Sequence, residues 1–499
     1  MGLSLLLSLC LPPLLTLPSD GRPMRFGLSV PAVELERGLA LGGHGAMQWR
    51  LLPIGPADGE NVWIELAIAA PRGTVRVVRG GDGPCPDGRG AAFVLSYDEQ
   101  RVAHGTVRVM RWQWVDGTID QRTRTTFTAT TELAGEVYQV GEGLTTQTPG
   151  LLDRATYWLR RGNDRAVRCG LLPARTKGLS TTKNVRRHLQ KVLPLLVEMG
   201  GQRGAGDFLR QDGVVTNLEF DTTLALLRCA VALQQPRAWQ LALRAAGHLR
   251  DRDLDVRTGL PFVHGMAHRE TTPEPGHTWL EGLLWVGLLT ADDGALVAAR
   301  SVGRALAAQL PMGTGREERL RDYAWPLLQL ECLLRVDPTK RLAIAADRLA
   351  ASIQLRFDAV ARTFRFGEGE LGGGVYLERG WLTAGILIPA LQSHLQRQPN
   401  PALAEKVRVV QQALTDRIGS GARGLPTHWR ITNGRVCAEH YERNTARASW
   451  LIEALSPRDQ SRILRRSSVR RAVGETPALE HPDLATEFTM LARCRWVWR

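Results

Sequence analysis

The second half of the chain repeats one unit: an aromatic-led, nearly all-apolar segment, a short turn, and an amphipathic segment rich in Arg and Ala. HTWLEGLLWVGLL and LERGWLTAGILIPAL are examples of the apolar segment. In the amphipathic segments apolar residues recur at helical spacing, as Leu342, Ala346, Leu349 and Ile353 do. A helix that is apolar on all sides must be buried on all sides. We therefore predict helical hairpins stacked with the apolar helices inside.

The arrangement of these hairpins is predicted from their connections. Connections within a hairpin are short, whereas those between hairpins are long and rich in Gly, Pro and aromatic residues. The spacing of the hairpins is irregular, which a superhelical solenoid would not show. We predict an (α/α)6 toroid over residues 184–499, with the long loops on one functional rim. Its helices are expected at 184–199, 218–234, 236–250, 277–290, 292–310, 320–335, 338–356, 378–396, 401–418, 444–455, 457–472 and 482–494.

The first part of the chain has a different texture. Residues 23–172 are rich in Val, Thr and aromatics, in runs such as MRFGLSV and TVRVMRWQWV separated by turn clusters. These short runs predict a β-barrel or β-sandwich, followed by a linker over 173–183. At 499 residues the chain is also too long for one core. The predicted fold class is therefore multi-domain α+β.

The extreme N-terminus predicts export. Residues 3–17 are apolar but too short to span a bilayer, which fits the core of a signal peptide over residues 1–22. We expect a secreted or periplasmic protein without a stable membrane span. The cysteines are scattered without a CxxC pair, and Cys229 and Cys332 lie in predicted core helices as buried thiols.

The net charge of +14 comes mostly from Arg and has two interpretations. One is codon bias, with the excess spread over solvated helix faces. The other is attraction to a polyanion, either nucleic acid or an acidic polysaccharide. No dense basic tract interleaved with aromatics is present, so nucleic acid is not expected as a partner.

The richest candidate site is the segment TGLPFVHGMAHRETTPEPGHTWLEG at residues 258–282. His264, His268 and His277 could ligate a metal, but the Gly and Pro residues oppose the helix that this spacing needs. One histidine in proton transfer is the better explanation. We predict no cofactor, and leave a divalent ion such as Ca²⁺ or Zn²⁺ open.

Two glutamates in these segments have a structural explanation. Thr278-x-x-Glu281 and Thr216-x-x-Glu219 both match a capping box, in which the glutamate stabilises a helix start. Asp221 and His277 match no such box. Both are expected near the start of an apolar helix, where the side chain can point into the centre of the ring.

Other helix starts supply further candidates. Their aromatic residues are expected to form a surface on which sugar rings stack, and their arginines could clamp a carboxylate. The candidates at these starts are Trp279, Asp322, Tyr323, Trp325, Arg379 and Trp381, and the loop before the next apolar helix adds His440, Tyr441 and Asn444.

Segments in both halves of the chain resemble a known family. PMRFGLSVPAVELERG and VWIELAIAA resemble the RIFT-barrel domain of exo-rhamnogalacturonan lyase-like proteins, and DGVVTNLEFDTTLALLR and GHTWLEGLLWVGLLTADDGAL resemble their toroid. The resemblance covers most of residues 24–499. It implies a six-hairpin glycosidase-like enzyme acting on a uronate-containing, pectin-like polysaccharide.

The chemistry implied by this resemblance is β-elimination. A lyase neutralises the uronate, removes the C5 proton and protonates the leaving oxygen. The resemblance implies that Arg379 and Asn444 neutralise the uronate, and that His277 and Tyr323 carry out the two proton transfers. His264 is the reserve, and His440 and Tyr441 are further catalytic candidates. Substrate binding is expected from Asp221, Trp279, Glu281, Asp322, Trp325, Arg379, Trp381 and Asn444.

Two alternatives remain open. A glycoside hydrolase would need two carboxylates across the scissile bond, and Asp221 with Glu281, or Asp322 with Glu378, could serve. A non-catalytic glycan-binding scaffold would keep only the tryptophan surface.

Overall fold

The protein is seen in a computed structural model that is mostly helical, with several small antiparallel sheets. The structure describes residues 15–19, 24–36, 39–42, 46–52, 61–69, 73–79, 93–102, 105–114, 122–128, 166–167, 169, 171–173, 180–201, 208–209, 215–216, 220–255, 257–263, 273–310, 318–419, 425–442, 445–464 and 484–498. Among these residues, no helix is long and apolar enough to cross a membrane.

The N-terminal region is built from antiparallel strands, as predicted. The described strands form three sheets in the orders β1-β6-β3, β2-β5-β4 and β7-β8-β9. Their bounds are β1 (Leu15–Ser19), β2 (Met24–Pro31), β3 (Leu39–Gly42), β4 (Ala46–Leu51), β5 (Asn61–Ala69), β6 (Gly73–Arg79), β7 (Phe93–Val102), β8 (Gly105–Trp114) and β9 (Arg122–Thr128). Strand β1 lies inside the predicted signal peptide and pairs with β6. Closure into a RIFT barrel stays a prediction.

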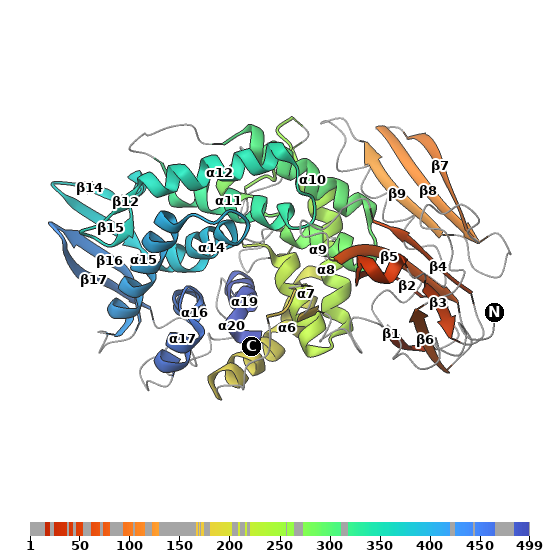
Figure 1. Ribbon diagram of the computed structural model, residues 1–499, viewed down its shortest axis with the longest axis horizontal. Helices are drawn as coiled ribbons and strands as arrows, with labels where there is room; N and C mark the ends of the chain where they lie inside the picture. Colours follow the sequence, from red (N-terminus) through yellow and green to blue (C-terminus); the bar gives the residue numbers. More distant parts are fainter. Residues whose placement is uncertain are drawn as a thin grey trace.

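Strands β2 and β5 bury side chains on both faces of their sheet. Phe26 and Leu28 pair with Leu66 and Ile64 on one face, and all four are buried. The other face packs on helix α9 (Glu281–Thr290), where Trp63 meets Trp285 edge-on at 6.1 Å. Figure 1 shows this sheet beside the helical domain.

The helical domain separates into inner and outer helices (Figure 1). The inner helices in the described part of the chain are α7 (Thr222–Leu233), α9, α11 (Leu320–Leu334), α16 (Thr445–Glu453) and α19 (Leu484–Arg493). One further inner helix consists of three consecutive segments, α13 (Gly380–Leu382), η4 (Thr383–Leu387) and α14 (Ile388–Arg397). The outer helices are α6 (Ser180–Gly201), α8 (Pro236–His248), α10 (Asp293–Ala308), α12 (Lys340–Leu355), α15 (Pro401–Gly419) and α17 (Pro457–Leu464).

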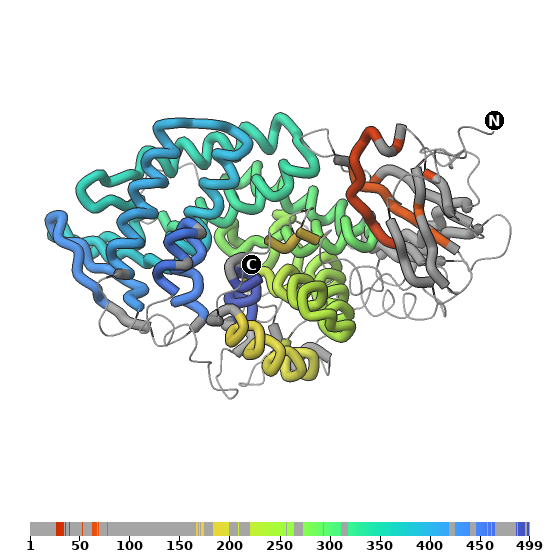
Figure 2. Tube along the Cα trace, turned by 60° about the horizontal axis from the view of Figure 1, so that its bottom comes forward, coloured from red at the N-terminus to blue at the C-terminus, as the bar shows by residue number. Residues whose placement is uncertain are grey.

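The inner helices form a closed ring. Each contacts the next in chain order, and α19 returns to contact α7. Outer helix α6, the first of the helical domain, packs on α19, the last inner helix, so the two ends of the domain meet where the ring closes (Figure 2). These contacts agree with the predicted toroid. The sequence had not indicated that the two ends of the domain pair with each other.

The inner and outer helices differ in how much of their surface is buried. Every residue of α9 is buried, whereas α12 buries one stripe that includes Leu342, Ala346, Leu349 and Ile353. The difference arises because α9 has neighbours on all sides and α12 faces water on one side.

A four-stranded sheet that the sequence did not predict extends from the ring. Its order is β14 (Glu370–Gly372), β15 (Val375–Arg379), β16 (Leu425–Thr432) and β17 (Arg435–Glu442). Strand β15 runs directly into α13, so the helix expected over residues 378–396 starts at Gly380 instead. The junction places Arg379 and Trp381 at the start of an inner helix.

Candidate functional site

The starts of the inner helices converge on an aromatic cluster, which we call the aromatic centre: Phe220, Trp279, Trp325, Trp381 and Trp450. Phe220 lies 4.9 Å from Trp450 and 6.1 Å from Trp325, and Trp279 lies 5.4 Å from Trp325, measured between ring centroids. All but Trp381 are buried. The predicted open stacking surface is therefore closed at Trp279 and Trp325, because these rings pack against each other.

Asp221 joins two of the converging helices. One carboxylate oxygen accepts from the Leu224 amide at 3.1 Å and caps α7, while the other accepts from the Gly282 amide of α9 at 2.9 Å. Asp221 thus does cap a helix, although it matches no capping box. A side chain at Gly282 would lie 2.4 Å from the Asp221 carboxylate, so only glycine permits this approach.

The capping box predicted for Glu281 does not form. Helix α9 begins at Glu281 itself, and the Thr278 hydroxyl donates to the Glu274 carbonyl at 3.0 Å. The amides of Leu280 and Glu281 instead donate to the Gln329 side chain of α11, at 2.7 and 3.0 Å. The box fails because the N-cap position of α9 is Leu280, two residues after Thr278, so Glu281 is the first helical residue rather than the third. The other predicted capping box, Thr216-x-x-Glu219, stays a prediction, because Glu219 lies outside the described residues.

The Glu281 carboxylate belongs to a buried ion cluster. It lies 3.8 Å from Arg228 and 3.7 Å from Arg493, and Arg493 also donates to the Phe220 carbonyl at 3.0 Å. Burial alone would raise the pKa of Glu281, but the two arginines outweigh it and the pKa is lowered. Burial raises the pKa of Asp221. Both predicted binding carboxylates thus hold helices together, and the Asp221 and Glu281 pair is not open to a sugar.

A more exposed polar cluster lies where α11 begins. His277 Nδ1 is 3.0 Å from Glu274, and Arg319 donates to Glu274 at 2.6 Å and to Asp322 at 2.8 and 2.9 Å. The side chains of Glu274 and Arg319 are each 35% exposed, Asp322 is 20% exposed and His277 is 8% exposed. Glu274, Arg319 and Asp322 bring this cluster to the surface, whereas the His277 ring is almost buried behind them.

The charges of this cluster organise His277. Burial alone would raise the pKa of Glu274, but the Arg319 and His277 interactions outweigh it and lower that pKa. An ionised Glu274 favours a proton on Nδ1 of His277, so the neutral ring carries its lone pair on Nε2. A carboxylate that sets the tautomer in this way is common in proton-transferring histidines.

Tyr323 lies beneath this cluster and is fully buried. Its hydroxyl accepts from Arg356 at 3.1 Å, and the Arg356 guanidinium lies 4.7 Å from the Tyr323 ring centre and pairs with Glu318. Burial raises the pKa of Tyr323. The structure therefore buries Tyr323 away from solvent, whereas the sequence had named it as a candidate for proton transfer.

Glu368 connects the α11 start to the next inner helix. One of its oxygens accepts from the Leu320 amide at 3.2 Å and the other lies 3.6 Å from Arg379. Arg379 is 46% exposed, and two residues later the partly exposed Trp381 carries the Arg447 guanidinium 5.1 Å from its ring centre. We call the surface from Glu274 to Trp381 the helix-start rim: Glu274, His277, Arg319, Asp322, Glu368, Arg379 and Trp381.

Asp322 and Glu378, the second carboxylate pair considered for a hydrolase, do not lie at one site. Asp322 lies on the helix-start rim, whereas Glu378 is buried in the β15 region. Glu378 accepts from Arg417 at 2.5 Å and from Thr363 at 2.7 Å. Glu378 is therefore a structural residue.

Several predicted residues remain untested. His264 and Asn444 lie outside the described residues, and His440 and Tyr441 lie on β17 with their side chains outside the description. Arg319 was missed by sequence reasoning, although its i, i+3 spacing to Asp322 at a helix start was visible. Among the described residues, no group of three or more His, Cys, Asp and Glu side chains could hold a metal ion.

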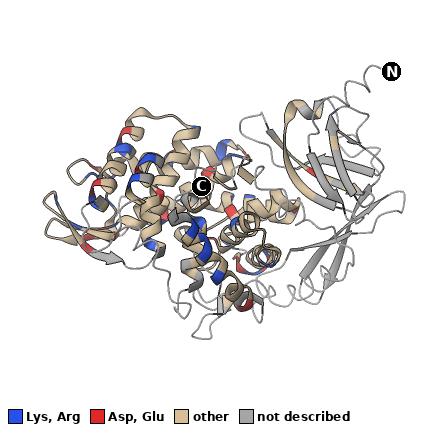
Figure 3. Cartoon of the chain, turned by 90° about the horizontal axis from the view of Figure 1, so that it is seen from below, with Lys and Arg blue, Asp and Glu red and all other residues tan. Residues whose placement is uncertain are grey.

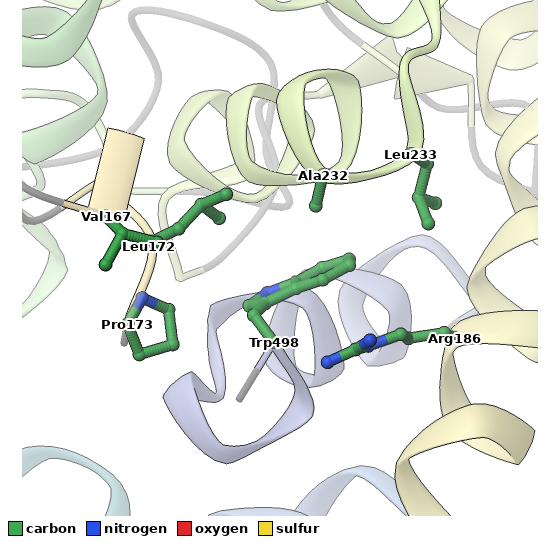
Figure 4. A pocket seen from close by; sticks show the side chains of 7 residues that line it. All are labelled: Val167, Leu172, Pro173, Arg186, Ala232, Leu233 and Trp498. Carbon is green, nitrogen blue, oxygen red and sulfur yellow. The ribbon is translucent and has the colours of Figure 1, made fainter. Parts of the chain in front are cut away.

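A small cavity lies away from the rim (Figure 4). Its volume is about 100 Å³, and its lining is apolar apart from Arg186, which donates to the Val497 carbonyl at 2.6 Å. Because Trp498 and Leu233 border it rather than any rim residue, this cavity is not part of the candidate site.

Basic and acidic residues are mixed on the described helices that Figure 3 shows. Figure 3 shows Lys and Arg on many helices with Asp and Glu between them. On the rim, Arg319 and Arg379 each lie beside a carboxylate. This pattern agrees with arginines spread over solvated faces more than with one basic surface for a polyanion.

Comparisons with known proteins gave distant structural likenesses. Neither the protein-family models nor the curated proteins match this chain. The cellobiose 2-epimerase of Bacillus thermoamylovorans has a TM-score of 0.44 at 13% identity, covering 58% of this chain and 84% of its own. A sugar epimerase from a ruminal bacterium has a TM-score of 0.44 at 8% identity, with the coverages again 58% and 84%.

A third likeness is of the same kind. The cellobiose 2-epimerase of Spirochaeta thermophila has a TM-score of 0.42 at 14% identity, over 60% of this chain and 86% of its own. At these scores the likeness carries no conclusion about activity or substrate. The ring is established by its own helix contacts.

Proposed function

We propose that the protein is a carbohydrate-active enzyme that transfers a proton at the helix-start rim. The observation that carries this proposal is the Glu274–His277 pair, 3.0 Å apart and backed by Arg319. A histidine oriented by a carboxylate is suited to take a proton from carbon or give one to oxygen near neutral pH. The Glu274–His277 pair lies at the starts of the inner helices of a ring, which supports a catalytic site rather than a core contact.

The residues around Trp381, at the other end of the helix-start rim, indicate the class of ligand. Trp381 is partly exposed, the Arg447 guanidinium lies 5.1 Å from its ring centre, and Arg379 precedes it by two residues. An indole face packs on a sugar ring, and guanidiniums pair with carboxylates. This combination supports an acidic, uronate-containing sugar as the substrate, although Arg379 must share its charge with Glu368.

The finer proposal is β-elimination. His277 takes the C5 proton of the uronate, a C4–C5 double bond forms, and the C4–O bond breaks. The leaving oxygen then needs a proton, which protonated His277 or solvent supplies. Because Tyr323 is buried, this scheme assigns it no role.

The test follows the products. The protein is incubated with rhamnogalacturonan and with oligogalacturonides across a broad pH range, and the absorbance of the unsaturated uronide is recorded. His277→Gln is expected to lower the rate by about 100-fold or more, as for loss of a general acid or base.

His394→Gln is the matched control. His394 is also hydrogen-bonded to a glutamate and adjoins an arginine, but it is buried between α11 and α14. It is expected to lose stability and to keep its activity per folded molecule. Full activity in His277→Gln would contradict the residue assignment.

The products also separate the competing functions. New reducing ends without absorbance would identify a hydrolase, and a changed sugar configuration without cleavage would identify an isomerising enzyme. Binding without any product would identify a glycan-binding scaffold. Each of these outcomes would overturn the elimination proposal.

A further inference from the structure

A groove on the outer surface lies between the end of α10 and the first half of α12 (Figure 1). Its volume is about 450 Å³, within the range of small-molecule sites. The floor is aliphatic and is formed by Ala307, Leu310, Ile344 and Ala345. Ile344 is 42% exposed, so the groove leaves apolar surface in water on the otherwise polar side of an outer helix.

The rim of this groove carries three cations and no acid. Lys340, Arg341 and Arg348 line it, and all three side chains are exposed. Arg341, Ala345 and Arg348 stand at positions i, i+4 and i+7 of α12, so the two arginines flank the apolar floor on one helix face.

The cations of this groove have no acidic residue beside them in its lining. Within the described part of the chain, none of the three forms an ion pair, whereas Arg300 pairs with Asp337 at 2.6 Å and Arg408 with Glu405 at 2.6 Å. Like charges gathered around a groove repel each other and attract an anion. The cations thus supply a complementary charge for an acidic ligand.

We propose that the α10–α12 groove binds an amphiphilic anion, specifically an alkyl carboxylate of medium chain length. The alkyl chain covers Ile344 and Leu310, and the carboxylate pairs with Arg341 and Arg348. The aliphatic lining has no aromatic side chain on which a sugar ring could stack. This ligand class is therefore separate from the sugar proposed for the helix-start rim.

The test measures binding of decanoate to the full chain by titration calorimetry, below the concentration at which decanoate forms micelles. Decanoate is expected to bind at least about tenfold more tightly than acetate, which lacks the chain, and than decanol, which lacks the charge. Binding should weaken with added salt, because the charge pairing is at the surface.

Two variants and one matched control locate the site. Arg341→Glu combined with Arg348→Glu, and separately Ile344→Asp, are each expected to weaken decanoate binding at least about tenfold. Arg237→Glu is the control, because Arg237 is also the exposed second residue of an outer helix, α8, but lies outside the groove. Circular dichroism checks that all variants are folded.

Three results would overturn the proposal. The first is no detectable decanoate binding to the unaltered protein. The second is equal affinity for acetate, which would indicate only a solvated basic face. The third is an equal loss of affinity in Arg237→Glu, which would indicate a general charge effect.

Discussion

Asp221 shows how one residue can determine where two helices begin. It has a positive φ of 63°, as does the preceding Phe220 at 73°, and both lie in a region that non-glycine residues rarely adopt. The two hydrogen bonds of Asp221 and the bond from Arg493 to the Phe220 carbonyl hold this conformation. The strain is local, but it places Phe220 within the aromatic centre.

Replacing Asp221 should therefore be costly. Asp221→Ala removes the cap of α7 and leaves the buried Gly282 amide without this acceptor, which we expect to cost about 2–4 kcal/mol of unfolding free energy. Asp292→Ala removes a comparable cap from outer helix α10, where Asp292 accepts from Ala295 at 2.9 Å, and should cost about 1 kcal/mol. Urea denaturation measures both. Equal losses would contradict the bridging role of Asp221.

At the scale of elements, a buried polar network fastens α11 to α14. Glu331 of α11 lies 2.8 Å from His394 and accepts two hydrogen bonds from Arg397, at 2.9 and 2.8 Å. Arg397 also reaches Asp347 of α12 at 2.6 Å. Neighbouring inner helices are thus joined by ion pairs as well as by apolar packing.

This network predicts a loss of stability in acid. Burial alone would raise the pKa of Glu331, but His394 and Arg397 outweigh it and lower the pKa below its ordinary value of 4.5. A lowered folded pKa means that the stabilisation is present above pH 4.5 and is lost as the pH falls through the folded pKa.

The measurement is the midpoint of thermal unfolding against pH. Glu331→Gln should be less stable than the unaltered protein at neutral pH and should lose less of its stability below pH 4.5. If the unfolding midpoints of the two proteins fell in parallel with pH, Glu331 would not contribute to the loss of stability in acid.

For the whole molecule, the decisive feature is that the two ends of the helical domain close the ring. Arg493 of the last inner helix lies 3.7 Å from Glu281 of the second, and its guanidinium lies 4.6 Å from the Trp325 ring centre of the third. The ion cluster therefore spans the middle of the ring and links helices far apart in the sequence.

Breaking this link should destabilise the ring as a unit. Arg493→Met removes one of the two arginines that flank the buried Glu281, and we expect a loss of about 3–5 kcal/mol. Adding Glu281→Gln removes the uncompensated charge, so the double variant should lose less than the two single losses summed. Denaturant unfolding of all four proteins gives the coupling. Additive losses would contradict a direct interaction.

The helices of the ring and their inner or outer place could be predicted from the sequence, because apolar spacing decides which faces a helix must bury. It also indicated the helix-start loops and His277, since polar residue types stand out beside apolar helices. Cys229 and Cys332 are buried free thiols, as their positions in core helices predicted.

The direction in which each side chain points could not be predicted and became visible in the folded protein. It closed Trp279 and Trp325 into the aromatic centre and placed Asp221 and Glu281 among backbone amides and arginines. It also brought Arg319 between Glu274 and Asp322, which are 48 residues apart. These outcomes depend on neighbours supplied by distant segments, and periodicity along one segment carries no information about those neighbours.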